Sequence, residues 1–153
     1  LVRREGTEAV YIDKVESTVS SIRMVSRVGS RIPLYCSGVG KALLAELPDP
    51  EIEDIWNSSE ITSLTPYTVT SLSDLMDRIR GVREAGFAMD DEENEEGVRC
   101  IAVSIPDYHK EPVYALSISA PVSRMTDARI AELSTDVLTF KKDLEKTLGF
   151  SRS

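Results

Sequence analysis

The sequence predicts a domain of the α+β class, with an antiparallel sheet and segregated helices. Short segments rich in β-branched and aromatic residues follow one another near the start of the chain and again after residue 86, as in antiparallel sheets. The segments between them, and the last one, have apolar residues at helical spacing. The 153 residues, 41% of them hydrophobic, suit one compact domain with a core.

Two strands are expected before the first helix. Residues 1–6 are a charged lead-in, and the β-branched and aromatic residues of 9–15 predict the first strand. Residues 22–28 alternate apolar and polar side chains, which predicts a second strand with one buried face. A loop over 29–32 separates this strand from the first helix.

The central helices carry their own start and stop signals. Ser37 can cap a helix that ends near 48–50, and residues 51–57 predict a short second helix. Ser71 can cap a third helix, which stops at Gly86.

The C-terminal part is expected to add strands and one long helix. The strands are predicted over 87–90, 98–105 and 113–120. Pro121 ends the last strand, and Thr126 or Asp127 caps a helix that continues to Gly149.

The composition excludes several classes of protein. With 18 basic and 26 acidic residues the net charge is −8, which disfavours contact with a nucleic-acid backbone. Cys36 and Cys100 form no metal or disulfide motif, so free thiols in the cytoplasm are expected. No apolar run approaches the roughly 20 residues of a membrane span, so no membrane partner is expected. Because the chain begins with Leu1, we interpret it as a piece of a longer protein.

The turn that precedes the first helix has two open interpretations. Residues 37–40 could present backbone N–H groups to a small anion, or their glycines could allow close packing. A nucleotide-binding loop is excluded, because its motif needs a glycine where this chain has Tyr35, and a Ser or Thr where it has Ala42. Lys41 is expected to lie outside any pocket.

The acidic run 90–96 lacks the alternating spacing of a calcium loop, so most of it is expected to be a solvated turn. Asp90 differs, because it ends an apolar strand and can point inward to accept a hydrogen bond from a ligand.

Small polar residues share faces of two predicted strands. Cys100, Ala102 and Ser104 alternate on one strand, and Ser117 and Ser119 alternate on its partner. If they face inward, they leave room for a ligand. The alternative is that Cys100 is buried as a small apolar group and that the serines face water.

Signals for an enzyme are weak. His109, the sole histidine, lies in a predicted hairpin loop, away from a nucleophile. A thiol redox enzyme using Cys100, with Cys36 as resolving residue, is one alternative, and a ligand-free dimerisation module is another. We expect no enzymatic activity, no cofactor and no metal.

Four stretches, in order, resemble the effector-binding domain of IclR-family transcription regulators: 31–45, 86–93, 96–102 and 115–121. The resemblance implies a GAF-like domain, with a curved antiparallel sheet flanked by helices and a pocket for a small organic acid or sugar acid. It also implies a homodimer or homotetramer, and DNA binding through a winged helix-turn-helix domain N-terminal to this chain. Residues 1–8 would end the linker from that domain, 9–150 would form the effector-binding domain, and 151–153 would be a tail.

The resemblance also implies the ligand-binding residues. Gly38 and Val39 match positions whose backbone N–H groups bind a carboxylate, and Ser21 replaces a larger apolar residue, which suggests a roomier cavity. The matching polar positions are Asp90, Cys100, Ser117 and Ser119, and the matching apolar wall positions are Met24, Ile32 and Val98.

Overall fold

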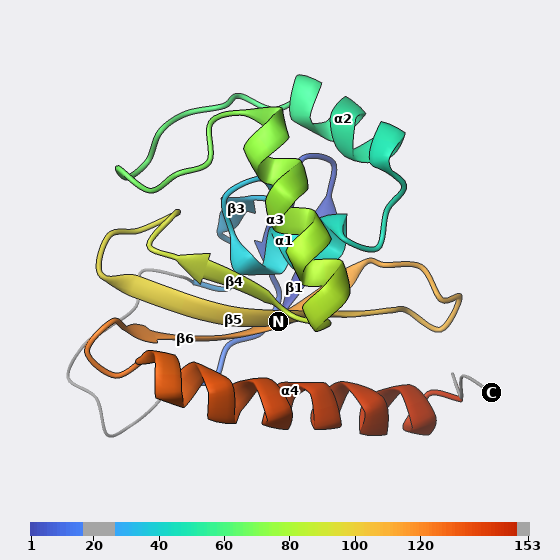
Figure 1. Ribbon diagram of the computed structural model, residues 1–153. Helices are drawn as coiled ribbons and strands as arrows, with labels where there is room; N and C mark the ends of the chain where they lie inside the picture. The colour runs from blue at the N-terminus through green and yellow to red at the C-terminus, as the bar shows by residue number, and fades with distance from the viewer. Residues whose placement is uncertain (17–26, 150–153) are drawn as a thin grey trace.

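The computed structural model describes residues 1–16 and 27–149, and it confirms the α+β class. In this part of the chain six strands form one antiparallel sheet, in the order β3-β2-β1-β6-β5-β4 (Figure 1). The strands are β1 (Val2–Glu5), β2 (Glu8–Tyr11), β3 (Arg31–Pro33), β4 (Ala88–Asp91), β5 (Val98–Ile105) and β6 (Tyr114–Pro121). The helices are α1 (Gly38–Leu44), α2 (Asp49–Asn57), α3 (Leu72–Ala85) and α4 (Asp127–Thr147).

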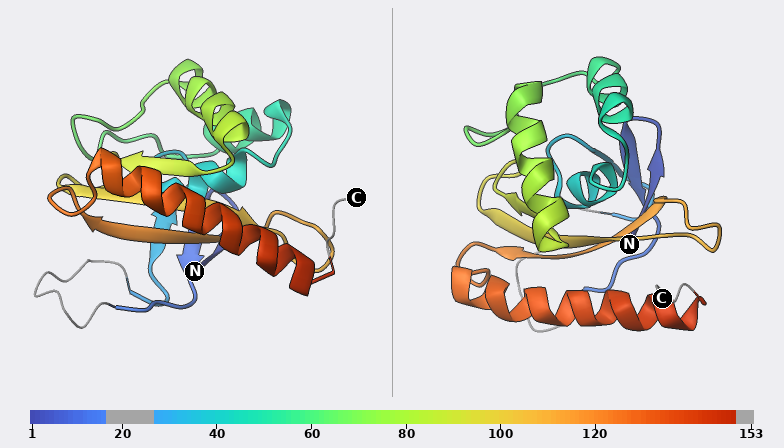
Figure 2. Two further views of the ribbon diagram at one scale, coloured as in Figure 1. Left: turned by 60° about the horizontal axis from the view of Figure 1, so that its bottom comes forward. Right: turned by 45° about the vertical axis from the view of Figure 1, so that its right-hand side comes forward.

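Helices lie on both faces of the sheet. α4 runs along one face, whereas α1 and α3 lie on the other, with α2 farther out (Figures 1 and 2). Side chains of β5 alternate between the two layers: Ala102 packs in the core on the α1 side, and Ile101 and Val103 pack in the core with α4. The alternation places Cys100 on the α1 side, two residues from Ala102.

The helix signals in the sequence are confirmed. Ser37, Ser71 and Thr126 each accept a hydrogen bond from the backbone N–H three residues on, at 3.1, 3.2 and 3.2 Å respectively. Gly86 follows α3 with a φ of 85°, the left-handed conformation that glycine adopts readily. Among the described helices, none has the length and apolarity needed to cross a bilayer.

The prediction for the N-terminus is wrong. Residues 2–5, expected as lead-in and linker, form β1, which pairs with β2 on one side and β6 on the other. Val2 is fully buried, so one apolar side chain anchors an otherwise charged strand. β2 is correspondingly shorter than the strand expected over 9–15.

The region before α1 also differs from expectation. β3 occupies part of the segment expected as a loop over 29–32, because Arg31 to Pro33 pair with β2. Of the strand predicted over 22–28, residues 22–26 lie outside the described residues. β2 and β3 lie at one end of the strand order, and β5 and β4 lie at the other end. Residues from both ends of the sheet line one cavity.

Candidate functional site

Three predicted site residues lie in one row across the sheet. Asp90 on β4 pairs with Cys100 on β5, and Cys100 pairs with Ser119 on β6. Sγ of Cys100 and Oγ of Ser119 lie 2.8 Å apart. Three polar side chains from three strands therefore meet on the same side of the sheet.

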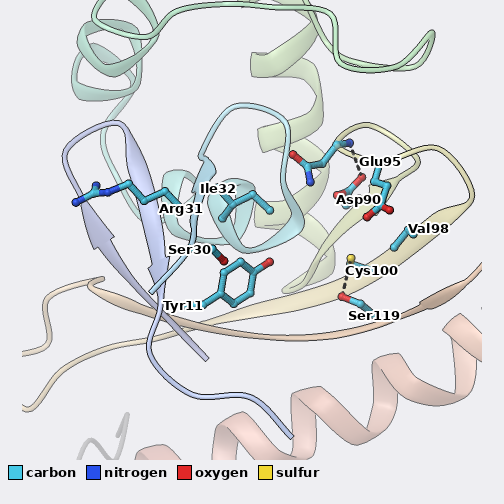
Figure 3. Close-up of a pocket in the computed structure, with 10 residues that line it drawn as sticks. Tyr11, Ser30, Arg31, Ile32, Asp90, Glu95, Val98, Cys100 and Ser119 are labelled. Carbon is cyan, nitrogen blue, oxygen red and sulfur yellow. Dashed lines mark hydrogen bonds between the residues drawn. The ribbon is translucent and has the colours of Figure 1, made fainter. Parts of the chain in front are cut away.

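This row forms one wall of a cavity of about 390 Å³, a volume suited to a small molecule (Figure 3). Figure 3 shows Tyr11, Ser30, Arg31 and Ile32 on the opposite side. The lining residues are Tyr11, Ser30, Arg31, Ile32, Asp90, Asn94, Glu95, Val98, Cys100 and Ser119.

The structure thus brings together Ile32, Asp90, Val98, Cys100 and Ser119 from the predicted set around one cavity. Their part in binding a ligand stays a prediction.

Other predicted residues lie elsewhere. Ser117 is opposite Ala102 and does not line the cavity. Val39 is buried in the core on the α1 side. Met24 and Ser21 lie outside the described residues.

The glycines of α1 are packed against other parts of the chain. Gly38 is buried, and a Cβ at this position would be 3.4 Å from the Cβ of Ala102 and from the backbone nitrogen of Asp90. A Cβ at Gly40 would overlap the backbone of Leu34. These contacts support the packing interpretation of the turn, and they place Gly38 directly behind the Asp90 wall.

Sequence reasoning missed five lining residues: Tyr11, Ser30, Arg31, Asn94 and Glu95. Strand alternation could have identified Tyr11, because it shares a face of β2 with the buried Ala9. Ser30 and Arg31 reach the cavity only because β3 pairs with β2, and no local pattern indicates that pairing.

Asp90 is only 3% exposed, and its carboxylate holds the loop that follows β4. Its Oδ1 accepts hydrogen bonds from the N–H groups of Glu93 at 2.8 Å and Asn94 at 3.4 Å. Burial raises the pKa of Asp90 to about 6, although these hydrogen bonds and the charge of Lys41 act in the opposite direction.

The acidic turn, most of which is predicted to be solvated, includes one fully buried carboxylate, that of Glu93. It forms an ion pair with Lys41 of α1, which is also buried, and its Oε2 lies 3.9 Å from Nη1 of Arg78 on α3. The hydroxyl of Thr68 donates to the carbonyl oxygen of Glu93 at 2.6 Å. The loop that carries Asn94 and Glu95 is therefore fixed to α1, α3 and the segment before α3.

The thiols are poor nucleophiles at neutral pH. Burial raises the pKa of Cys36 to about 12, and burial also raises the pKa of Cys100 to about 12. Reactive thiols have lowered pKa values, so this geometry gives the redox alternative no support. His109 is exposed in the β5–β6 loop, and among the described residues no three His, Cys, Asp or Glu side chains are placed to hold a metal ion.

Asp90 is predicted to make stability depend on pH. The pKa of Asp90 is higher in the folded state than in the unfolded chain, so the folded state binds the proton more tightly. The stability that this proton contributes is lost as the pH rises from about 4 to about 6. The Asp90→Asn variant keeps an oxygen acceptor for the loop. The difference in unfolding free energy between the variant and wild type should shift by about 2–3 kcal/mol in favour of the variant as the pH rises from 4 to 7. Urea denaturation across this range measures the difference, and a constant difference would contradict the prediction.

The sequence and fold match those of known proteins. The sequence profile described as "Bacterial transcriptional regulator IclR C-terminal" matches residues 1–145. The HTH-type transcriptional regulator XynR of Escherichia coli is 36% identical over 95% of this chain and 58% of its own length. The acetate operon repressor of Salmonella typhimurium is 37% identical over 95% of this chain and 53% of its own length.

A solved structure agrees with these sequence relatives. The crystal structure of Thermotoga maritima IclR has a TM-score of 0.87 and 38% identity, and the match covers 97% of this chain and 60% of that one. The chain spans somewhat more than half the length of the curated relatives named above. It belongs to the IclR family of bacterial transcriptional regulators and corresponds to the family's C-terminal domain.

Proposed function

We propose that this chain is the effector-sensing domain of a DNA-binding transcription regulator, and that its cavity binds a small organic acid or sugar acid. The observation that carries the proposal is the row of Asp90, Cys100 and Ser119, which lines a cavity of about 390 Å³. Hydroxyl, thiol and carboxyl groups in one wall suit a hydroxylated ligand of this size.

DNA binding would be carried out by a further part of the regulator, equivalent to the part of its relatives that this chain does not cover. Relatives that share this domain are named as repressors, and the net charge of −8 disfavours DNA contact by this chain. To regulate DNA affinity, the effector must favour one arrangement of a homodimer or homotetramer over another. A cytoplasmic location and the absence of enzymatic activity follow from this role.

Within the cavity, Ser119 and Asp90 would bind hydroxyl or carbonyl groups, and Ile32 and Val98 would form the apolar wall. The backbone N–H groups of Gly38 and Val39 remain proposed donors to a carboxylate.

Calorimetric titration with a panel of acids tests the proposal. The panel comprises glycolate, 3-hydroxybutyrate, D-gluconate and 3-hydroxybenzoate. At least one should bind, and Ser119→Ala should weaken it about 2- to 10-fold through the loss of one hydrogen bond. Ser117→Ala is the matched control, because this serine lies two residues away on β6 but outside the lining. Failure of every acid to bind, or equal effects of the two variants, would overturn the assignment.

A further inference from the structure

The cavity carries more negative than positive side chains. Its lining has two carboxylates, Asp90 and Glu95, and one guanidinium, that of Arg31. Nη2 of Arg31 lies 2.7 Å from Oε2 of Glu5, and its Nη1 lies 3.7 Å from Oε1 of Glu8. Figure 3 shows the Arg31 guanidinium pointing away from Asp90 and Glu95. Arg31, the one cation among the described lining residues, therefore already has two carboxylate partners outside the cavity.

The cations behind the cavity wall are also paired. Lys41, whose charge acts on Asp90, forms a buried ion pair with Glu93, and Arg78 lies near the same carboxylate. In the part of the chain that the structure describes, no basic side chain at the cavity is without an acidic partner. As far as the described residues go, an effector carboxylate would thus enter beside two carboxylates with no unpaired cation to balance it, which is unfavourable in a site of low dielectric constant.

Asp90 has one carboxyl oxygen available for a proton. Its Oδ1 accepts the two backbone hydrogen bonds of the following loop, whereas its Oδ2 accepts none from the described residues. Groups from several elements face Asp90: Tyr11 of β2, Cys36 before α1, Lys41 of α1, Glu93 of the loop and Cys100 of β5.

These neighbours offer Asp90 little compensating charge. Tyr11, Cys36 and Cys100 have pKa values raised to about 12 by burial, so they are neutral near pH 7, and Lys41 is offset by Glu93. Asp90 itself, with a pKa of about 6, is the carboxyl that can take up a proton near neutral pH.

We propose that this cavity binds an anionic effector together with one proton, which is held on Oδ2 of Asp90. The protonated carboxyl then donates a hydrogen bond to a hydroxyl or carbonyl oxygen of the effector, and it no longer repels the effector's carboxylate. The balance is simple: one effector anion and one proton from solvent combine with the ionised site, and no other bond changes. Asp90 is thereby a specificity residue, because an uncharged polyol gains nothing from the proton. This inference rests on the proposed function.

The test is calorimetry of the acids of the panel above in buffers of different ionisation enthalpy. At pH 7.5 an acid that binds should take up close to one proton per site. Between pH 6.5 and 8 its affinity should fall about tenfold per pH unit, although such acids are themselves ionised throughout. D-Sorbitol, the uncharged counterpart of D-gluconate, should show neither effect. Binding of an acid with no proton uptake overturns this inference and leaves the proposed function standing. Absence of binding by every acid at both pH 5.5 and pH 8 overturns the proposed function and this inference together.

Two variants locate the proton. Asp90→Asn should abolish proton uptake and make affinity independent of pH, with binding at pH 8 at least as tight as in wild type. Glu95→Gln, the matched change at the other lining carboxylate, should retain the uptake of one proton. Loss of uptake in Glu95→Gln, or its persistence in Asp90→Asn, would contradict the assignment to Asp90. If Asp90→Asn does not fold, the proton uptake of wild type and of Glu95→Gln, measured in the same set of buffers, still tests the assignment.

Discussion

Replacing Lys41 by Met is expected to destabilise the domain by about 3–5 kcal/mol, the cost of breaking a buried ion pair by removing one partner. The side chains of Lys41 and Glu93 are only 2% and 1% exposed. Without the ammonium group, the Glu93 carboxylate would remain buried, with Arg78 as its other nearby cation. Its Oε1 is already without a hydrogen-bond partner among the described residues. Urea denaturation followed by far-UV circular dichroism measures the loss.

A matched surface pair provides the control. Arg129 and Glu132 form an ion pair on α4 with side chains 52% and 65% exposed, so Arg129→Met should cost no more than about 1 kcal/mol. Adding Glu93→Leu to Lys41→Met removes the uncompensated charge and should recover much of the stability. The prediction is wrong if Lys41→Met costs no more than Arg129→Met, or if the second substitution recovers nothing.

Local signals explain what the sequence predicted well. The caps Ser37, Ser71 and Thr126 act over three residues, and so they can be identified from spacing alone. The alternation along β5 is also local, and it predicted that Cys100 and Ala102 share a face. These features positioned the main polar wall of the cavity before any contact was known.

Long-range pairings explain what was missed. Lys41 and Glu93 lie 52 positions apart. Glu93 belongs to an acidic run whose composition suggests exposure, and nothing in the small and apolar residues around Lys41 indicates its partner. β1 has three polar residues out of four and becomes a strand because β2 and β6 pair with it. Arg31 reaches the cavity through the same sheet order. No periodicity within a segment encodes such partners, so the places of Ser30 and Arg31 in the opposite wall of the site could not be derived.

The turn before α1 leaves no room for a side chain at Gly40. Oγ of Ser37 donates to the carbonyl oxygen of Pro33 at 2.6 Å and accepts from the N–H of Gly40 at 3.1 Å, which closes the turn tightly. A Cβ at Gly40 would overlap the carbonyl oxygen, Cα and carbonyl carbon of Leu34. Since these are backbone atoms, no change of rotamer can relieve the overlap.

Gly40→Ala is therefore expected to destabilise the domain by about 3 kcal/mol or more, since the backbone of a fully buried segment must shift. Gly81→Ala is the matched control: Gly81 lies within α3, and a Cβ there would meet nothing within 4 Å. That variant should gain about 0.5–1 kcal/mol, because alanine loses less conformational freedom in a helix. Thermal unfolding of both variants decides. If Gly40→Ala melts at the wild-type temperature, the turn from Leu34 to Gly40 cannot be as closely packed as described, and the position of α1 behind the Asp90 wall would need revision.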